Sequence, residues 1–355
     1  MQVLLRRKVS IGVILVLLLA IVAGCGSVAS PEDSLTGQEN AGSNSASSSG
    51  EEGVAGSTSY PLTIVNHALS GEGGTWTAKE QRFEQSPEKV VANTQPAAEL
   101  LIRLGLTEKM VGVAALYGEV APDIADEFAT IPVLSKDYVG KELVLGANPD
   151  LVLGRGDLFA DADWGVGTVD ALNELSIKTF VQNTSVKGAD LESLFQDIEQ
   201  IGQIFDIQER ATQYAEDLRK RVETIKSITP AAEKPVSFAY ISSSEKGAVA
   251  VYSGANDTFQ ADALRLLNLE NSFGEADGEV GVEQLISTNP DILLISYYSG
   301  GPDTEEMVNH LYDNPALQSM SAIKDKKIFI IDFNQFWGYG DQIFDGVEKL
   351  GGQLY

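Results

Sequence analysis

One sequence pattern occurs twice in the chain, with every position offset by 141 residues. The first copy is KELVLGANPDLVLGRGD (141–157), and the second is VEQLISTNPDILLISYY (282–298). Each copy has a Glu seven residues before the Pro of an Asn-Pro-Asp triplet, and an apolar run after the Asp. Because Pro cannot continue a helix and biases the preceding Asn away from helical geometry, each triplet should join a short helix to a strand. The chain is therefore predicted to contain two similar α/β halves.

Short β-type runs alternate with helical stretches on both sides of a long helical segment. The first block spans 86–185, and the second begins at Pro235. Between them, apolar residues at spacings of three and four predict nearly continuous helix over 189–228. We therefore predict an α/β fold with two lobes, each a mostly parallel sheet flanked by helices, joined by a long interlobe helix. The predicted boundaries are 60–188 for the N-terminal lobe, 189–230 for the interlobe helical segment and 231–355 for the C-terminal lobe.

The N-terminus has the features of a targeting segment. A basic stretch, Arg6 to Lys8, precedes an apolar run that has the length of a secretory signal and is short for a membrane span. The run ends in small residues before Cys25, the only cysteine. This resembles a bacterial lipobox, which implies that residues 1–24 are a lipoprotein signal peptide and that Cys25 is lipidated. The alternatives are an ordinary signal peptide or an anchor helix. Residues 25–59 are rich in Ser, Gly and Asn, and predict a disordered tether.

The charge and motif content narrow the function classes. The chain has 25 basic and 51 acidic side chains, a formal net charge of −26, which argues against binding nucleic acid or docking on anionic lipid by charge. We find no glycine-rich phosphate loop, no Gly-x-Ser-x-Gly elbow and no His beside a candidate nucleophile. The protein is therefore expected not to be an enzyme, and to be a monomer.

The repeated Glu is not explained by the helix-to-strand joint. At 100° per residue, Val144 and Leu145 lie about 200° and 300° around the helix from Glu142, so this Glu faces solvent. Glu283 has the same relation to the apolar residues of its own helix. An acidic residue in a first helical turn gains under about 1 kcal/mol from the helix dipole, which accounts for one Glu better than for an equivalent pair.

The order of signal, α/β lobe, long helix and α/β lobe resembles the substrate-binding proteins of bacterial ABC importers. The resemblance is to the class with a rigid interlobe helix, which carries ferric siderophores, haem and cobalamin. Besides the two Glu-containing copies, the strings SPEKVVANTQPAAELLIRLGLTEKMVGVA (86–114) and NPALQSMSAIKDKKIFIID (314–332) match this pattern. The resemblance extends over residues 86–355.

The resemblance implies a function and a set of partners. The chain would be lipid-anchored at the extracytoplasmic face of the bacterial cell membrane, and would deliver a small-molecule metal chelate to an ABC permease dimer with a cytoplasmic ATPase. Glu142 and Glu283 would meet arginines on the two permease subunits. A ferric siderophore is the leading ligand, with cobalamin or haem as alternatives and a non-transport surface lipoprotein as a competing function.

Ligands of open α/β sheets bind beyond the carboxyl ends of the strands, and aromatic residues are dense in the corresponding loops. They suit a flat or bulky ligand of mixed polarity, although loop aromatics can also be lobe-edge core. Arg155 directly follows a strand and is the candidate for pairing with ligand oxygens. The only histidines, His67 and His310, lie outside these loops. A site without histidines favours a chelated metal over a bare ion as the ligand. We expect no resident cofactor and no metal bound directly by the protein. The predicted ligand-binding residues are Arg155, Tyr117, Tyr138, Trp164, Tyr252, Tyr297, Tyr298, Trp337 and Tyr339.

Overall fold

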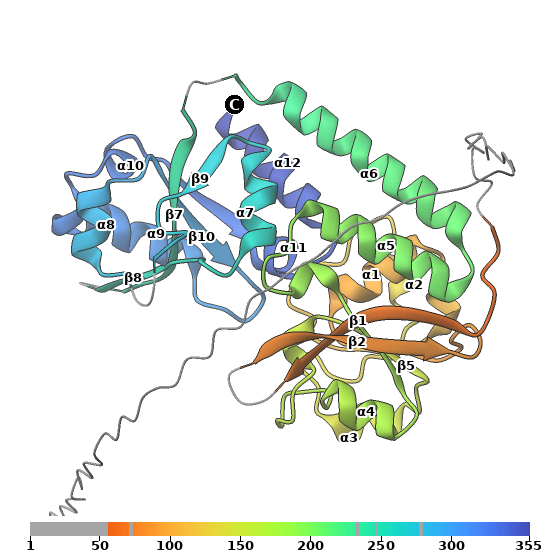
Figure 1. Ribbon diagram of the computed structural model, residues 1–355. Helices are drawn as coiled ribbons and strands as arrows, with labels where there is room; N and C mark the ends of the chain where they lie inside the picture. The colour runs from red at the N-terminus through yellow and green to blue at the C-terminus, as the bar shows by residue number, and fades with distance from the viewer. Residues whose placement is uncertain (1–55, 71–73, 232–233, 246–247, 277–279) are drawn as a thin grey trace, which may run out of the picture. The chain divides into compact units, whose positions relative to one another are not determined.

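A computed structural model describes residues 56–70, 74–231, 234–245, 248–276 and 280–355 (Figure 1). The predicted signal peptide, Cys25 and most of the predicted tether lie outside the described residues. Thr58, at the end of the predicted tether, is tied to the folded body. Its hydroxyl donates to the carbonyl of Gln203 at 2.6 Å, and the hydroxyl of Tyr60 donates to that of Ile204 at 2.7 Å.

The N-terminal lobe is built on a four-stranded parallel sheet in the order β4-β3-β5-β6. The predicted apolar run LVLG forms β5, with all four residues buried, as expected of a parallel strand covered on both faces. Pro96 stands in the first turn of α1. The side chain of Thr94, just before this helix, accepts a hydrogen bond from the N–H of Ala97. The elements are β3 (Val90–Ala92), α1 (Gln95–Arg103), β4 (Met110–Val113), α2 (Ala125–Phe128), α3 (Lys141–Gly146), β5 (Leu151–Gly154), α4 (Val169–Glu174) and β6 (Lys178–Val181).

An antiparallel hairpin of β1 (Leu62–Ser70) and β2 (Thr75–Phe83) precedes this sheet and was not predicted. The buried amide of Asn66 attaches it to β6: its Oδ1 accepts from the N–H of Val181 at 2.7 Å, and its Nδ2 donates to the carbonyl of the same residue at 3.0 Å. The hairpin therefore belongs to the N-terminal lobe.

The C-terminal lobe has a five-stranded sheet in the order β11-β10-β7-β8, with β9 also pairing with β7. The β7–β8 pair is antiparallel and the other pairs are parallel, in agreement with the predicted mostly parallel sheet. The strands are β7 (Val236–Glu245), β8 (Ala248–Tyr252), β9 (Leu269–Asn271), β10 (Ile292–Tyr297) and β11 (Ile328–Asp332). The helices are α7 (Thr258–Arg265), α8 (Val282–Thr288), α9 (Thr304–Asp313), α10 (Ser321–Lys324), α11 (Phe333–Trp337) and α12 (Ile343–Leu354).

The interlobe segment consists of two helices rather than one: α5 (Leu191–Phe205) and α6 (Gln208–Ile228). The break falls at Asp206, which adopts a left-handed conformation with φ of 58°, so the chain turns there while its apolar spacing continues. The apolar periodicity predicted the helical residues correctly, but it contains no signal for this turn. Helix α6 spans 21 residues.

One hydrophobic core extends through both lobes. It includes Leu100 of α1 and Leu104 just after this helix, together with Phe336 of α11 and Phe344 of α12, all fully buried. Gly338 and Gly340, which follow α11, lie close against Pro96 in the first turn of α1. The two lobes are therefore joined by packing as well as by the chain.

Candidate functional site

Arg155 stands at the carboxyl end of β5, where a buried amide fixes its backbone. The Oδ1 of Asn93 accepts from the N–H of Arg155 at 2.8 Å, and its Nδ2 donates to the carbonyl of Arg155 at 3.0 Å. The preceding Gly154 has φ of 143°, and a Cβ there would lie 2.0 Å from the Oδ1 of Asn93, so only glycine fits. The sheet edge thus presents Arg155 in one defined backbone position.

The guanidinium of Arg155 is already paired within the N-terminal lobe. Its Nε lies 2.6 Å from Oδ1 of Asp157, and its Nη2 donates to Oδ2 at 2.7 Å. The same group lies 5.1 Å from the centre of the Tyr339 ring, a cation–π contact with the C-terminal lobe. Burial is the largest influence and lowers the pKa of Arg155, but the carboxylate of Asp157, together with Tyr339 and Tyr138, raises the pKa overall. Arg155 is charged, with part of its donor set occupied.

Arg155 and the C-terminal lobe enclose a pocket of about 280 Å³, hereafter the aromatic pocket. Strands β7 and β10 and helix α11 supply its other walls, so it lies where strands of both lobes end. The ring centres of Tyr240 and Trp337 are 5.2 Å apart, and those of Phe333 and Trp337 are 5.5 Å apart and stacked. The lining is Arg155, Tyr240, Ile241, Ser242, Tyr252, Leu294, Ser296, Phe333 and Trp337.

A buried carboxylate, Asp257, supports these rings. The indole Nε1 of Trp337 donates to its Oδ2 at 2.9 Å, and burial raises the pKa of Asp257. The neighbouring Tyr240 is buried, and its hydroxyl has no hydrogen-bond partner among the described residues. Burial, and then the charge of Asp257, raise the pKa of Tyr240, so that its phenol stays neutral. Sequence analysis missed Tyr240, Phe333 and Asp257.

A second pocket of about 380 Å³, the Tyr339 pocket, combines the ends of β6 and the β8–α7 loop. Tyr339 has φ of 58°, an uncommon conformation for a residue with a large side chain. Two side chains of the N-terminal lobe hold its carbonyl: the hydroxyl of Thr184 donates at 2.7 Å, and the Nε2 of Gln182 at 3.3 Å. Burial raises the pKa of Tyr339 to about 12. The lining is Leu69, Gly74, Trp76, Asp157, Thr184, Ser185, Val186, Lys187, Asn256, Asp257, Thr258, Phe259, Gln260 and Tyr339.

The predicted ligand-binding residues divide into two groups. Arg155, Tyr252 and Trp337 line the aromatic pocket, and Tyr339 lines the second one. The other five, which line neither pocket, are Tyr117, Tyr138, Trp164, Tyr297 and Tyr298.

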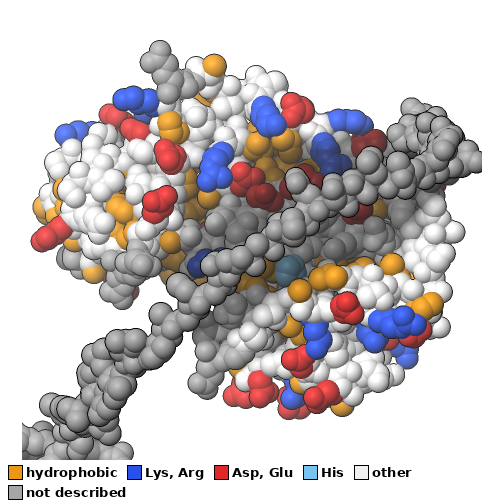
Figure 2. Space-filling view, viewed as in Figure 1, with side chains coloured by type: hydrophobic (Ala, Val, Ile, Leu, Met, Phe, Trp, Pro, Cys, Tyr) orange, Lys and Arg blue, Asp and Glu red, His pale blue; other side chains and the backbone are white. Residues whose placement is uncertain are grey.

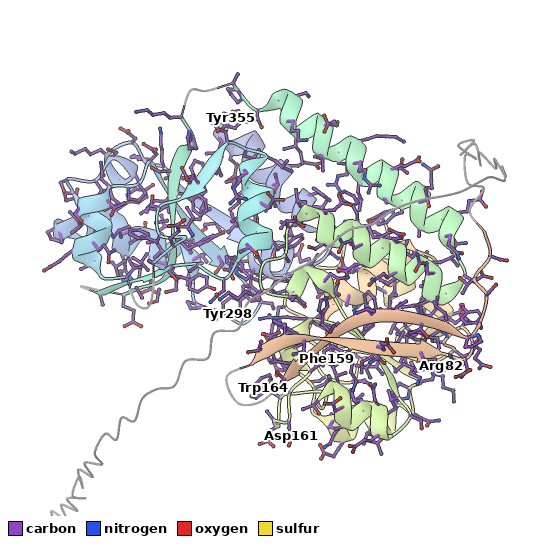
Figure 3. All side chains as sticks on the ribbon, in the orientation of Figure 1. Arg82, Phe159, Asp161, Trp164, Tyr298 and Tyr355 are labelled. Atoms are coloured by element: carbon purple, nitrogen blue, oxygen red, sulfur yellow. The ribbon has the colours of Figure 1, made fainter. Side chains whose placement is uncertain are left out.

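The five remaining aromatics have other surroundings. Tyr117 and Tyr138 pack edge to face at 5.3 Å, and the carbonyl of Tyr117 accepts from the N–H of Ser299 in the opposite lobe at 3.1 Å. Tyr298 packs on Phe333. Trp164 and Tyr297 are 48% and 46% exposed, and Trp164 lies on the loop before α4 (Figure 3). The two pockets are therefore lined by fewer of the loop aromatics than the sequence predicted.

The repeated sequence forms the same structure in both lobes. Gly140 and Gly281 precede α3 and α8 with nearly identical backbone angles, φ/ψ of −78°/158° and −77°/156°. Glu142 and Glu283 are both exposed in the first turn. The residues Asn148 and Asn289 are left-handed, with φ of 52° and 51°, away from helical geometry as predicted.

The Asp of each Asn-Pro-Asp triplet secures the neighbouring strand. Asp150 accepts from the N–H groups of Glu88 and Lys89, just before β3, at 2.8 and 3.0 Å. Asp291 accepts from the N–H and hydroxyl of Ser237 in β7 at 2.9 and 2.7 Å. The triplets are structural joints, and the exposed Glu residues take no part in them.

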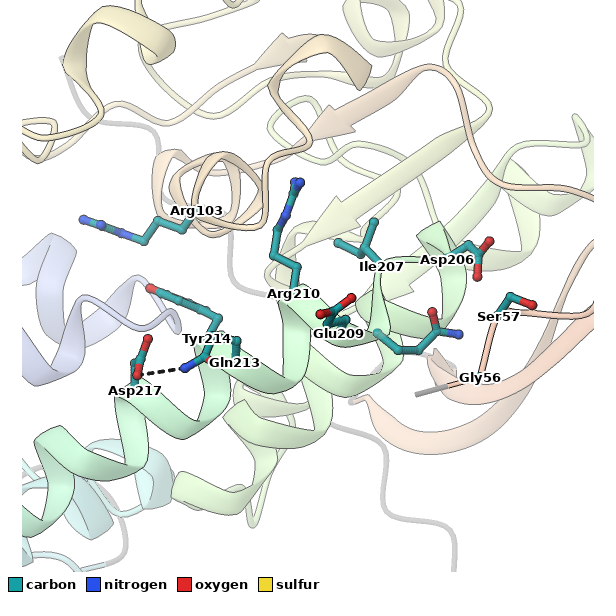
Figure 4. A pocket seen from close by; sticks show the side chains of 11 residues that line it. Gly56, Ser57, Arg103, Asp206, Ile207, Glu209, Arg210, Gln213, Tyr214 and Asp217 are labelled. Atoms are coloured by element: carbon teal, nitrogen blue, oxygen red, sulfur yellow. Dashed lines mark hydrogen bonds between the residues drawn. The ribbon is translucent and has the colours of Figure 1, made fainter. Parts of the chain in front are cut away.

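A larger groove of about 740 Å³ lies at the start of α6 (Figure 4). Its side chains are mainly polar, and its arginines are already engaged: Arg103 with Asp123 and Asp341, and Arg210 with the carbonyl of Leu104. It lies away from the carboxyl ends of the strands. Figure 2 shows acidic and basic side chains interspersed over the visible face of the molecule.

Among the described residues, no group of three or more His, Cys, Asp or Glu side chains could hold a metal ion. None of the helices formed by those residues is both long and apolar enough to cross a bilayer.

Comparison with known proteins gives one family assignment. A family model described as periplasmic binding protein matches residues 90–335. An uncharacterized ABC transporter substrate-binding lipoprotein of Bacillus subtilis is 22% identical over 357 residues, which cover 99% of this chain and 98% of the relative. A vitamin B12-binding protein of Yersinia pestis is 24% identical over 219 residues, which cover 60% of this chain and 70% of the relative.

A solved structure from Saccharomonospora viridis shares the fold. It is described as an ABC-type Fe3+-hydroxamate transport system, and its TM-score is 0.64 at 21% sequence identity. The superposition covers 83% of this chain and 99% of that structure. At this level of identity the likeness establishes the architecture, and the ligand must be argued from the site.

Proposed function

The chain belongs to the periplasmic binding protein family, and we propose that it is the substrate-binding receptor of an ABC importer for a metal chelate, with a ferric siderophore as the leading ligand. The observation that carries this proposal is the position of the aromatic pocket. Arg155 of one lobe faces Tyr240, Tyr252 and Trp337 of the other across a space at the ends of the strands. A ligand there contacts both lobes.

The properties of the site favour a chelate over a bare ion. Its walls are aromatic, its polar groups are hydroxyls and one guanidinium, and the described residues contain no metal-binding cluster. The aromatic and Tyr339 pockets have volumes of about 280 and 380 Å³, close to the lower end of the range of about 300–1,000 Å³ for small-molecule sites. Cobalamin is the second candidate, supported by the vitamin B12-binding relative, and haem the third.

The equivalence of α3 and α8 supports the proposed partner. A twofold permease presents the same surface twice, and this chain presents an exposed Glu twice on matching helical turns. We propose that Glu142 and Glu283 contact the two subunits of a permease dimer that is driven by a cytoplasmic ATPase. Lipidation of Cys25 would hold the receptor at the extracytoplasmic face of the membrane.

Ligand titration of the Cys25→Ala chain tests anchoring and binding together. This variant should leave the membrane fraction, because the acyl attachment site is lost, while the pocket is unchanged. Tryptophan fluorescence, to which Trp337 of the aromatic pocket and Trp76 of the Tyr339 pocket contribute, should then be quenched by a ferric siderophore at micromolar concentration or below. No response to any ferric siderophore, cyanocobalamin or haemin would refute the receptor function, and a variant that stays in the membrane would refute lipid anchoring at Cys25.

A further inference from the structure

We infer that the interlobe site selects chelates that are neutral or cationic, and excludes polyanionic complexes such as a ferric tris-catecholate. This inference rests on the proposed receptor function and specifies the charge of its ligand. Its basis is the balance and pairing of the charged side chains that line the two pockets.

The lining carries no excess of positive charge. The linings of the two pockets contain four Lys, Arg, Asp or Glu side chains. They are the cations Arg155 and Lys187 and the anions Asp157 and Asp257. A complex of charge −3 would normally be balanced by several unpaired cations. Within the described residues that line the pockets, only Lys187 is a cation without a salt bridge, and it is exposed.

Arg155 is the cation nearest the aromatic walls, and Asp157 neutralises it. Its Nη2 donates to Asp157 at 2.7 Å and its Nε lies 2.6 Å from the same carboxylate, and Asp157 lines the Tyr339 pocket. A guanidinium has five N–H donors, so Arg155 retains donors for ligand oxygens. It can therefore donate hydrogen bonds, but it adds little net positive potential.

Besides Asp157, two carboxylates lie at or near the walls. Asp257 is only 6% exposed and directly supports Trp337. Asp332 caps the start of α11 and accepts from the N–H groups of Asn334 and Gln335. Burial raises the pKa of Asp332, and the nearby Glu119 raises it further. An added anion would be repelled by these groups in surroundings that screen charge poorly.

The remaining polar groups suit a ligand with acceptor oxygens and apolar or flat parts. Ser242, Ser296 and the N–H groups of Arg155 offer donors, and four aromatic side chains line the same pocket. The buried, neutral phenol of Tyr240 is the wrong form for a phenolate ligand to iron. The chelate is thus expected to keep its own complete coordination shell.

The test compares probes of different charge on the full chain. The probes are a ferric tris-hydroxamate of charge 0 or +1, cyanocobalamin, which is neutral, and a ferric tris-catecholate of charge −3. At physiological ionic strength we expect the tightest neutral or cationic probe to bind at least tenfold more tightly than the tris-catecholate. Asp157→Asn should improve tris-catecholate binding about fivefold, the effect of one close charge pair in water.

Asp170→Asn is the matched control, since Asp170 is an exposed carboxylate that pairs with Lys79 and lines neither pocket. It should leave all affinities unchanged. Tris-catecholate binding as tight as that of the best neutral probe, or an unchanged tris-catecholate affinity in Asp157→Asn, would overturn the charge selection and leave the receptor function intact. Binding of none of the probes would overturn both.

Discussion

Asn93 shows how one buried side chain positions the site. Its amide satisfies both the N–H and the carbonyl of Arg155, and Gly154 leaves the room that this contact requires. The position of the Arg155 guanidinium over Tyr339 therefore depends on a residue in another loop. Asn93 is itself fully buried, so the contact is shielded from water.

Asn93→Asp should weaken both folding and ligand binding. The carboxylate cannot donate to the carbonyl of Arg155, and it places a buried charge there, so we expect a loss of about 1–3 kcal/mol in the free energy of unfolding. Asn66→Asp is the control, because Asn66 makes the same pair of backbone contacts to Val181 away from the aromatic pocket. Chemical denaturation should show similar destabilisation of both variants, and isothermal titration should show reduced affinity only for Asn93→Asp. Equal affinities would mean that Asn93 has no role in positioning Arg155.

Some residues of the site could be predicted from the sequence and others could not. Arg155 was predicted because it directly follows an apolar run, and strand ends are where ligands bind. Tyr240 lies inside the β-type run VSFAYIS, where an aromatic side chain is ordinary core, and only its neighbours across the sheet place it at a pocket. Trp164 and Tyr297 were predicted from strand-end position alone, which does not specify the direction of a side chain.

At the scale of elements, α3 and α8 are the best-predicted pair. Their helix-to-strand joints follow from Pro sterics, and both have the left-handed Asn and the Asp contacts to a neighbouring strand. The β1–β2 hairpin was missed because its strands carry many polar residues, with burial confined largely to alternate positions of β1. The turn between α5 and α6 was missed because a left-handed Asp206 leaves the apolar spacing intact.

Replacement of both exposed Glu residues should separate docking from binding. Because Glu142 and Glu283 are exposed and line neither pocket, the Glu142→Ala, Glu283→Ala double variant should keep the wild-type ligand affinity. Uptake of labelled ligand by cells should be abolished, and each single variant should be impaired to a lesser extent. Glu108→Ala provides an exposed control in the N-terminal lobe. Normal uptake by the double variant would exclude these residues as permease contacts.

At the scale of the whole molecule, buried acids lie where the lobes meet. Glu99 of α1 accepts from Gln95 at 2.7 Å and from Gln342, just before α12, at 2.9 Å. Asp341 accepts from the hydroxyl of Tyr214 in α6 at 2.5 Å. Together with the shared hydrophobic core, these contacts join α1, α6 and the start of α12. Sequence patterns predicted the two lobes but not this junction, because it brings together segments about 240 residues apart.

Two buried carboxyls, Glu99 at this junction and Asp197 in α5, give folding stability an unusual dependence on pH. Burial raises the pKa of Glu99 from 4.5 to about 7, and it also raises the pKa of Asp197 to about 7. At a pH between the unfolded and the folded pKa of such a group, its carboxyl is ionised in the unfolded chain and protonated in the folded chain. The stabilisation from each group is thus fully present below its unfolded pKa, and is lost as the pH rises through about 7.

Acidification from pH 8 to pH 5.5 should therefore raise the melting temperature, since both groups become protonated in the folded state. For Glu99 alone the effect is on the order of 2 kcal/mol, or several degrees for a domain of this size. In Glu99→Gln this part of the pH dependence should disappear, because the side chain no longer titrates. The Oε1 of Gln342 has no hydrogen-bond partner in the described part of the chain, so the Gln342 amide can turn and accept a hydrogen bond from the amide introduced at position 99. Glu108→Gln, at an exposed position, should retain the full dependence and so control for the general effect of reduced negative charge. The prediction would be contradicted if acidification from pH 8 to pH 5.5 lowered the melting temperature, and lowered it equally in the wild type and in Glu99→Gln. Glu99 would then be ionised in the folded protein.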